Sequence, residues 1–181
     1  MADSRCYCNY RFNYGRRIPD AKRFPFYDGP FAPGVFPSQT TVTDGLAKTA
    51  FVSERMSGSF GSQDSPDPSR DLKMMSHDAP SHGLTEEQQI ASCLENPPYE
   101  WHTSLGKTWI YRTMDDTNYN HNGRPNDPRP SCGGTNYGLQ PPRSYHPNLV
   151  HVLFGDGHVE PVAATIDIAV WRSLGTYNRG D

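Results

Sequence analysis

Two residues near the carboxyl end, His146 and Asp156, have side chains able to do chemistry. Histidine acts as a general base or a metal ligand, and a carboxylate can orient it or bind calcium. A structural interpretation stands beside each: Asp156 and Gly157 form a β-turn between apolar strands, and the His146 ring hydrogen-bonds the backbone where a strand begins. We favour the structural interpretations. We therefore expect no catalytic residue and no metal site, with calcium at Asp156 as the alternative.

The remaining histidines offer no better metal site. His151 and His158 lie in the two strands that flank the turn, where we expect them to share a face. At ~3.3 Å per residue, however, they are too far apart along the strands to hold one ion. His77, Asp78 and His82 cluster in a polar stretch that we interpret as solvated loop.

Four cysteines are present, namely Cys6, Cys8, Cys93 and Cys132, and none of them forms a CxxC pair. Cys6 and Cys8 are too close in sequence for a usual zinc site. We favour a disulfide between Cys93 and Cys132, which requires an oxidising compartment. Four unrelated thiols are the alternative.

Composition narrows the class of protein. The chain has 181 residues, of which 34% are hydrophobic and 12% aromatic, with 16 glycines and 17 prolines. This mixture predicts a single domain over residues 1–181, built from short elements and long loops around a small aromatic core. The net charge of −3 includes no basic stripe, which argues against a nucleic-acid partner. We expect no membrane segment and no export signal in the chain as given, since no apolar run approaches ~20 residues.

The first half of the chain predicts two strands and a long loop. Residues 9–15 alternate polar and aromatic side chains, which is typical of a half-buried strand, and residues 50–53 form a short apolar strand. Asp44 is placed to cap a helical turn that reaches Lys48. Residues 56–83 are rich in Ser, Gly, Pro and Asp, and we interpret them as a mobile surface loop.

Two short helices are predicted in the second half. Thr85 and Gln88 fit a capping box, and Asn96-Pro97 stops the helix that follows. Asp167 caps the final helix, after which Gly175 occupies the position of a left-handed cap.

Between these helices the sequence predicts strands and a hairpin. Residues 109–111 favour a strand. Residues 149–163 favour a hairpin with a two-residue turn, which sets Phe154 opposite Val159. We expect the three tryptophans to lie in the core; they are Trp101, Trp109 and Trp171.

Several of these segments, in this order, resemble the DUF1559 family, whose members are abundant in planctomycete-type bacteria and carry a prepilin-like N-terminus. His146, nine intervening residues and Asp156-Gly157 fit its C-terminal H-X9-DG signature. The chain departs from the family pattern at Asn148-Leu149, where two glycines are usual, and at His151, where asparagine is common. The other matching segments are Asn9-Tyr10-Arg11, Thr43-Asp44-Gly45-Leu46 with Thr49 and Ser53-Glu54-Arg55 after it, Tyr119-Asn120-His121, Pro125-Asn126, Ser131-Cys132, Ser144-Tyr145-His146-Pro147, Val152-Leu153-Phe154 and residues 166–176.

The resemblance implies an α+β fold, namely a pilin- or pseudopilin-like C-terminal domain without the family's long N-terminal helix. An antiparallel sheet, closed by the 149–163 hairpin, would pack against two short helices and be wrapped by long ordered loops. The missing helix would leave an apolar groove on the sheet. The motif residues would then be structural; they are His146, Asp156, Gly157, Asp44 and Gly45.

The resemblance also implies a function. It indicates a secreted or cell-surface structural module, not an enzyme, whose partners are protein subunits of a type II secretion or type IV pilus-like assembly. No cofactor is expected other than the calcium alternative. A different hypothesis is an extracellular glycan- or solute-binding module with Trp101 and Tyr119 as contacts, and a hydrolase using His146 is a third.

Overall fold

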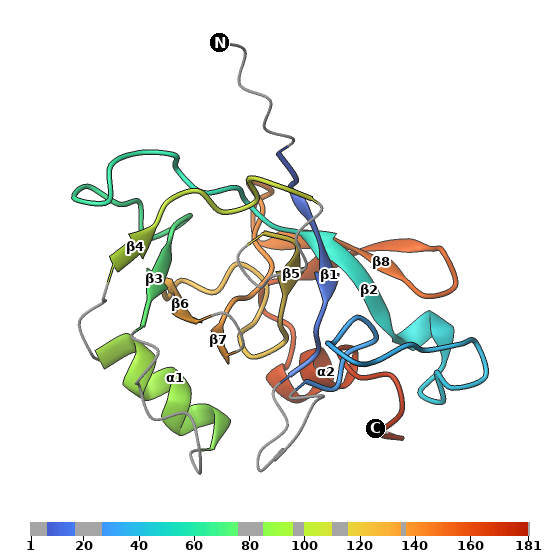
Figure 1. Cartoon of the computed structure of the whole chain (residues 1–181). Coiled ribbons are helices and arrows are strands. Elements are labelled where there is room, and N and C mark those ends of the chain that lie inside the picture. Colours follow the sequence, from blue (N-terminus) through green and yellow to red (C-terminus); the bar gives the residue numbers. More distant parts are fainter. Residues whose placement is uncertain are drawn as a thin grey trace.

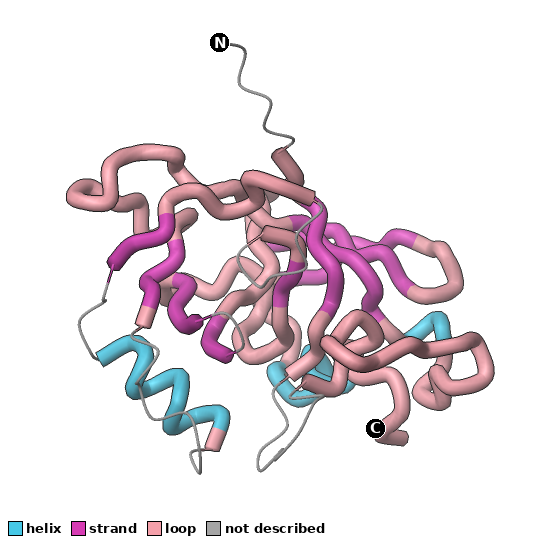
Figure 2. The backbone as a smooth tube through the Cα atoms, in the orientation of Figure 1, coloured by secondary structure: helices cyan, strands magenta, loops and turns pink. Residues whose placement is uncertain are grey.

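Two β-sheets lie side by side, and one short helix packs against each of them (Figures 1 and 2). This arrangement comes from a computed structural model that describes residues 7–16, 27–75, 85–95, 100–109, 116–134 and 137–180. The α+β class is confirmed, and no long N-terminal helix is present in those ranges. Among the described helices, none has the length and apolar character needed to cross a bilayer.

The first sheet has five strands and holds the largest apolar cluster among the described residues. Its strand pairs are antiparallel except for β5 and β1, which run parallel. In spatial order its strands are β5 (Asn118–Tyr119), β1 (Tyr10–Asn13), β2 (Ala50–Glu54), β8 (Leu149–Phe154) and β9 (Val159–Ala163). One 3-10 turn, η1 (Leu46–Lys48), precedes β2, and helix α2 (Ile168–Ser173) covers the inner face of the sheet through Trp171. The buried cluster comprises Ala50, Tyr119, Val150, Val152, Phe154, Val162 and Trp171.

The second sheet has four strands and supports helix α1 (Glu86–Glu95). In spatial order its strands are β4 (Glu100–His102), β3 (Leu72–Met74), β6 (Ser131–Gly134) and β7 (Tyr137–Leu139). The pair β3–β6 is parallel, so the single antiparallel sheet that we expected is instead two mixed sheets. The prediction that residues 56–83 form a mobile loop is wrong where they form β3. Leu72 of β3 is fully buried, and β3 pairs with a strand on each side.

Both predicted helix starts are confirmed. Each is fixed by hydrogen bonds between residues that are close in sequence. The Gln88 N–H donates to Thr85 Oγ1 (3.2 Å), and the Thr85 N–H donates to Gln88 Oε1 (2.9 Å), as in a capping box. At α2, Asp167 Oδ1 accepts from the N–H groups of Ala169 (2.8 Å) and Val170 (3.2 Å). Both caps satisfy amide groups that a helix start leaves unpaired.

The predicted left-handed cap at Gly175 is wrong, since Gly175 is not among the described residues with positive φ. It is buried, and a Cβ added there would lie 2.5 Å from His121 Cγ. Glycine is therefore required for close approach of the chain after α2 to the His121 ring.

We expect Gly175→Ala to lower the free energy of unfolding by about 1–3 kcal/mol, the usual cost of overpacking. Urea unfolding followed by circular dichroism measures the change. Gly61→Ala is the matched control, because its added Cβ would meet its nearest neighbour at an ordinary 3.4 Å. Equal stabilities for the two variants would contradict this packing argument.

The β8–β9 hairpin is confirmed, but its predicted register is wrong by one residue. Leu153 lies opposite Val159, and the Phe154 N–H donates to the His158 carbonyl (2.9 Å). The loop therefore spans three residues, 155–157, and its last glycine has a φ of 95°. A three-residue loop that ends in a left-handed glycine is a common alternative to the two-residue turn.

In this register His151 and His158 lie on opposite faces of the sheet, although we expected them to share one. A shift of one residue in pairing moves every side chain of a strand to the other face. His158 stacks on Phe154 of the inner face, with ring centroids 4.5 Å apart. His151 lies on the outer face of β8, next to Glu54 of β2.

The expected tryptophan core is only partly correct. Trp171 is fully buried and Trp101 is half-buried, whereas Trp109 is 59% exposed. The predicted strand at residues 109–111 lies mostly outside the described residues. Also outside them are Cys6, His77, Asp78 and His82.

Candidate functional site

The two ends of the H-X9-DG signature do not meet in the structure. His146 Nε2 lies 3.3 Å from Glu54 Oε1, and its ring packs edge-on against His151 with centroids 4.8 Å apart. We expected the His146 ring to bind the backbone; it faces a carboxylate instead. Asp156 lies at the tip of the β8–β9 hairpin and bonds a different histidine, His158. The motif is therefore not a catalytic pair.

Asp156 is engaged in the hairpin turn. Its Oδ1 accepts from the His158 N–H (3.1 Å) and faces His158 Nδ1 at 2.6 Å. Hydrogen bonds from the His158 backbone and ring hold the pKa of the Asp156 carboxyl below its usual value. Gly157 supplies the left-handed conformation that the last loop residue requires. The calcium alternative at Asp156 would have to compete with these bonds.

Asp44 holds the residues after α2 and does not cap a helix. The predicted helical turn exists as η1, but no side chain caps it. The Asp44 carboxylate instead accepts from Thr176 Oγ1 (2.8 Å) and from the N–H groups of Arg179 (3.1 Å) and Gly180 (2.6 Å). Gly45 has a φ of 97°, which favours glycine. The segment therefore joins the start of β2 to the last residues after α2.

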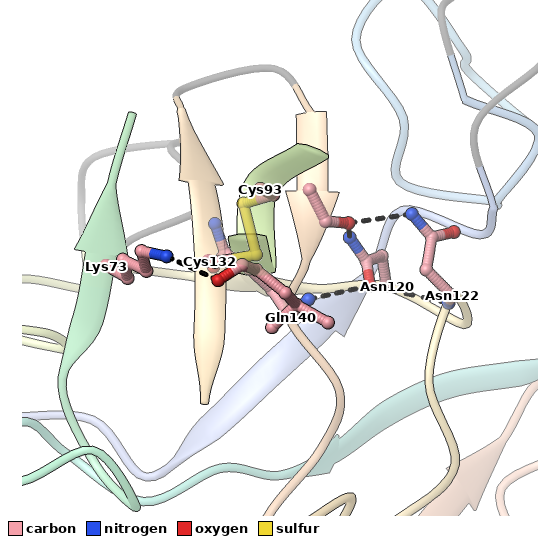
Figure 3. Close-up of a disulfide and its surroundings, with 8 residues drawn as sticks. Lys73, Cys93, Asn120, Asn122, Cys132 and Gln140 are labelled. Atoms are coloured by element: carbon pink, nitrogen blue, oxygen red, sulfur yellow. Dashed lines mark hydrogen bonds between the residues drawn. A yellow bond between two sulfur atoms is a disulfide. The ribbon is translucent and has the colours of Figure 1, made fainter. Parts of the chain in front are cut away.

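The structure joins Cys93 of α1 to Cys132 of β6 by a disulfide, the pair favoured from the sequence (Figure 3). Both cysteines are buried. Lys73 of β3 strengthens the same contact, because its Nζ donates to the Leu94 carbonyl near the end of α1 (2.7 Å). Burial lowers the pKa of this lysine. The disulfide is the covalent link between α1 and the four-stranded sheet.

The segment Tyr119-Asn120-His121 connects the two sheets. Asn120 Nδ2 donates to the Gly138 carbonyl of β7 (2.7 Å), and the Asn120 N–H donates to the Gln140 carbonyl (2.9 Å). Figure 3 shows Asn120 and Gln140 bonded beside the disulfide. Tyr119 is fully buried in the core of the five-stranded sheet, so the hypothesis that it contacts a glycan or solute is wrong.

His121 is a buried contact that sequence reasoning missed. Its Nδ1–H donates to the Trp171 carbonyl (2.7 Å), and its ring stacks on the Trp171 indole with centroids 3.9 Å apart. Tyr119 Oη lies 3.3 Å from the other ring nitrogen, Nε2. Burial lowers the pKa of His121 to about 3, so the ring is neutral near pH 7. Its neighbourhood in the sequence offers no signal for this contact, because its partner is fifty residues away.

Strand β1 buries its polar side chains and exposes its aromatic ones. Arg11 and Asn13 are fully buried, whereas Tyr10 is 61% and Phe12 41% exposed. The burial of Asn13 has a clear reason, because its Nδ2 donates to the carbonyls of Ala50 (2.7 Å) and Gly175 (2.9 Å). The aromatic side of β1 consequently lies on the outer face of the sheet, away from Trp171.

An apolar row crosses this outer face. Phe12 of β1 lies opposite Val52 of β2, Val52 lies opposite Leu153 of β8, and Leu153 lies opposite Val159 of β9. Directly opposed residues share a face of the sheet. Phe12 is 41% and Val159 60% exposed, and the other two are partly exposed. We call these four side chains the outer row.

Glu54, His146 and His151 meet beside the outer row. Glu54 ends β2, His151 lies in β8, and His146 lies in the loop before β8. These are the three side chains that the structure brings together at the histidine of the signature, and only His146 was a candidate from the sequence. Glu54 was not a candidate site residue from the sequence, and ninety-two positions separate it from His146.

The comparisons with known proteins give a family and nothing closer. The family described as "Protein of unknown function (DUF1559)" matches residues 9–169 of this chain. No curated protein matches the chain, and no solved structure does. The match spans β1, the disulfide, the connecting segment, the hairpin and the start of α2. Since it covers well over half of the sequence, this chain belongs to the DUF1559 family.

Proposed function

We propose that this protein is a non-enzymatic, extracytoplasmic module of a pseudopilin-like assembly, linked to a type II secretion or type IV pilus-like system. The observation that carries the proposal is the outer row, a continuous apolar stripe across four strands on the face opposite the core. In such a module the stripe packs against an apolar segment of another subunit or of a longer form of the same chain. Contiguous exposed apolar surface of this kind marks interaction sites.

The Cys93–Cys132 pair supports an extracytoplasmic location. Disulfides persist in secreted and cell-surface proteins and are rare where thiols are kept reduced. Both sulfur atoms belong to the buried cluster between α1 and β6, so the bond belongs to the fold and is not placed for redox chemistry. The non-enzymatic part of the proposal is supported by Asp156 and His121, which both make structural hydrogen bonds.

We expect substitutions in the outer row to block assembly without unfolding the protein. Fully burying a valine or phenylalanine side chain contributes about 1.5–3 kcal/mol, so the double variant Phe12→Ser and Val159→Ser should lose more than tenfold in association. The wild type, tagged after Asp181 and produced in its source cells, should fractionate with sheared high-mass surface material. The double variant should appear in the soluble fraction.

Val170→Ser is the matched control, because Val170 is 51% exposed but lies on α2, on the opposite side of the sheet. It should fractionate like the wild type. Recovery of the wild type solely as soluble monomer would count against the proposal, as would normal assembly of the double variant.

A solute-binding module is the second candidate function, and one cavity favours it. This cavity of about 310 Å³ lies beside β1 and the end of β2 and is lined by Tyr10, Arg70, Arg143 and Tyr145, among others. Its two tyrosines and three arginines, the third being Arg55, suit a small anionic solute. A screen of carboxylate and phosphate compounds by thermal shift separates this function from assembly, which predicts no ligand.

A further inference from the structure

Glu54, His146 and His151 form a group with the composition of a metal site. Within the described part of the chain, they are the three His, Cys, Asp or Glu side chains whose ligand atoms all lie within 4.8 Å of one another. Glu54 Oε1 is 3.3 Å from His146 Nε2, and Glu54 Oε2 is 3.3 Å from His151 Nδ1. Two imidazoles and one carboxylate are a common set of protein ligands for Zn²⁺.

We propose that these three residues bind a divalent transition-metal ion, Zn²⁺ in the first instance. Zinc–nitrogen and zinc–oxygen bonds of about 2.0–2.1 Å place two ligand atoms of a tetrahedral site about 3.3 Å apart. The two nitrogen–oxygen separations are also 3.3 Å, one to each oxygen of the Glu54 carboxylate. The metal would take the place of the direct contacts between the carboxylate and the two imidazoles, and small movements of the Glu54 carboxylate and the His146 ring would complete the site.

The backbone holds the three ligands in place. The His151 N–H donates to Glu54 Oε2 (2.8 Å), which fixes the carboxylate against β8. The His146 N–H donates to Ser144 Oγ (3.1 Å), and Ser144 Oγ in turn donates to the Leu149 carbonyl (2.8 Å). The two imidazoles meet edge to face, at 85° between ring planes. Supporting hydrogen bonds of this kind orient metal ligands and raise affinity.

The solvent exposure of the group suits an ion that exchanges with solution. The Glu54 side chain is only 15% exposed, whereas those of His146 and His151 are 51% and 40% exposed. A carboxylate that is largely shielded from water favours a cationic partner. The partly open histidines leave a route for a metal ion to reach it.

The fourth coordination position would face the cavity that Glu54 and His146 help to line. Three protein ligands with an open position characterise zinc sites that bind water or an exogenous ligand. Tyr10, Arg70 and Tyr145 line the same cavity, so an anionic oxygen ligand would be favoured there. This inference does not depend on the assembly proposal, because the cavity lies beside the outer row and includes none of its four side chains.

Titration of chelator-treated protein with Zn²⁺ in a calorimeter tests the site. We expect about one high-affinity equivalent per chain. Losing one of three direct ligands should weaken binding by at least the ~10–100-fold that loss of an outer-shell partner costs. His146→Gln and His151→Asn carry this test, since both side chains are partly exposed. Glu54→Gln is a third variant. Its circular dichroism spectrum checks that β2 and β8 still pair.

His158→Asn is the matched control, because His158 lies on the same hairpin and bonds Asp156, outside the group. It should bind Zn²⁺ like the wild type. The visible spectrum of the Co²⁺-loaded protein gives a second measurement: intense bands of a four-coordinate site are expected in the wild type and His158→Asn and absent in His151→Asn.

Two results would overturn the site. One is wild-type protein that binds no Zn²⁺ at micromolar concentrations. The other is unchanged affinity in His146→Gln and His151→Asn, which would locate the ion at other residues, such as the histidines outside the described ranges. Wild-type folding of these two variants without metal keeps the comparison valid.

Discussion

Reduction of the Cys93–Cys132 disulfide should lower the free energy of unfolding by about 4 kcal/mol. The bond closes a segment of 39 residues, and the loss of chain entropy on closing a loop of that size gives this magnitude. Without it, α1 is held to the sheet by a small apolar cluster and the Lys73–Leu94 hydrogen bond. A domain stabilised by only about 5–15 kcal/mol is then brought close to unfolding.

Urea unfolding with and without a phosphine reductant measures this effect, and Cys93→Ser with Cys132→Ser reproduces it without reductant. Cys8→Ser is the control, since Cys8 is a free thiol that donates to the Tyr10 carbonyl. It should unfold like the wild type and should respond equally to reductant. A change smaller than ~1 kcal/mol on reduction would mean that α1 packing alone stabilises this half of the protein.

The second large effect is loss of stability in acid, and it depends on His121. An unfolded histidine titrates near 6.5, whereas burial lowers the folded pKa of His121 to about 3. Between these values the unfolded chain binds a proton that the folded chain excludes. The stabilising contribution is therefore complete above pH ~6.5 and is lost as pH falls, by up to ~1.4 kcal/mol per pH unit, or roughly 3 kcal/mol at pH 4.5.

His121→Asn tests this cause directly. Asparagine can retain the hydrogen bond to the Trp171 carbonyl but does not titrate, so the variant should lose the slope of stability against pH between ~6.5 and 4.5. It should also be less stable than the wild type near pH 7, because the ring no longer stacks on Trp171. His158→Asn, on the hairpin surface, should keep the wild-type slope. Identical slopes in wild type and His121→Asn would refute the assignment.

The local features of the fold were accessible from the sequence. The capping box at Thr85, the cap at Asp167, the positions of β1 and β2 and the position of the β8–β9 hairpin were all predicted correctly. Each arises from hydrogen bonds, propensities or turn conformations that involve a few neighbouring residues. These local interactions do not depend on how distant segments of the chain are arranged.

The orientation of side chains was not accessible in the same way. The alternation in β1 predicted a strand, but only tertiary contacts decided that Asn13 would be buried and Phe12 exposed. The buried carbonyls of Ala50 and Gly175 supply partners for Asn13, and these come from distant segments. Likewise, the choice of a three-residue loop moved His158 to the inner face, because strand periodicity reverses with a shift of one position.

The sequence by itself thus determined the two helix starts, the first two strands of the chain and the hairpin, and which family the chain resembles. Only the tertiary structure decided which residues meet. Gly175 contacts His121, Asp44 holds the residues after α2, and Glu54 joins His146 and His151. These contacts depend on how two mixed sheets pack and on strand order, and both are set by burial of apolar surface over the whole chain, which no short pattern encodes.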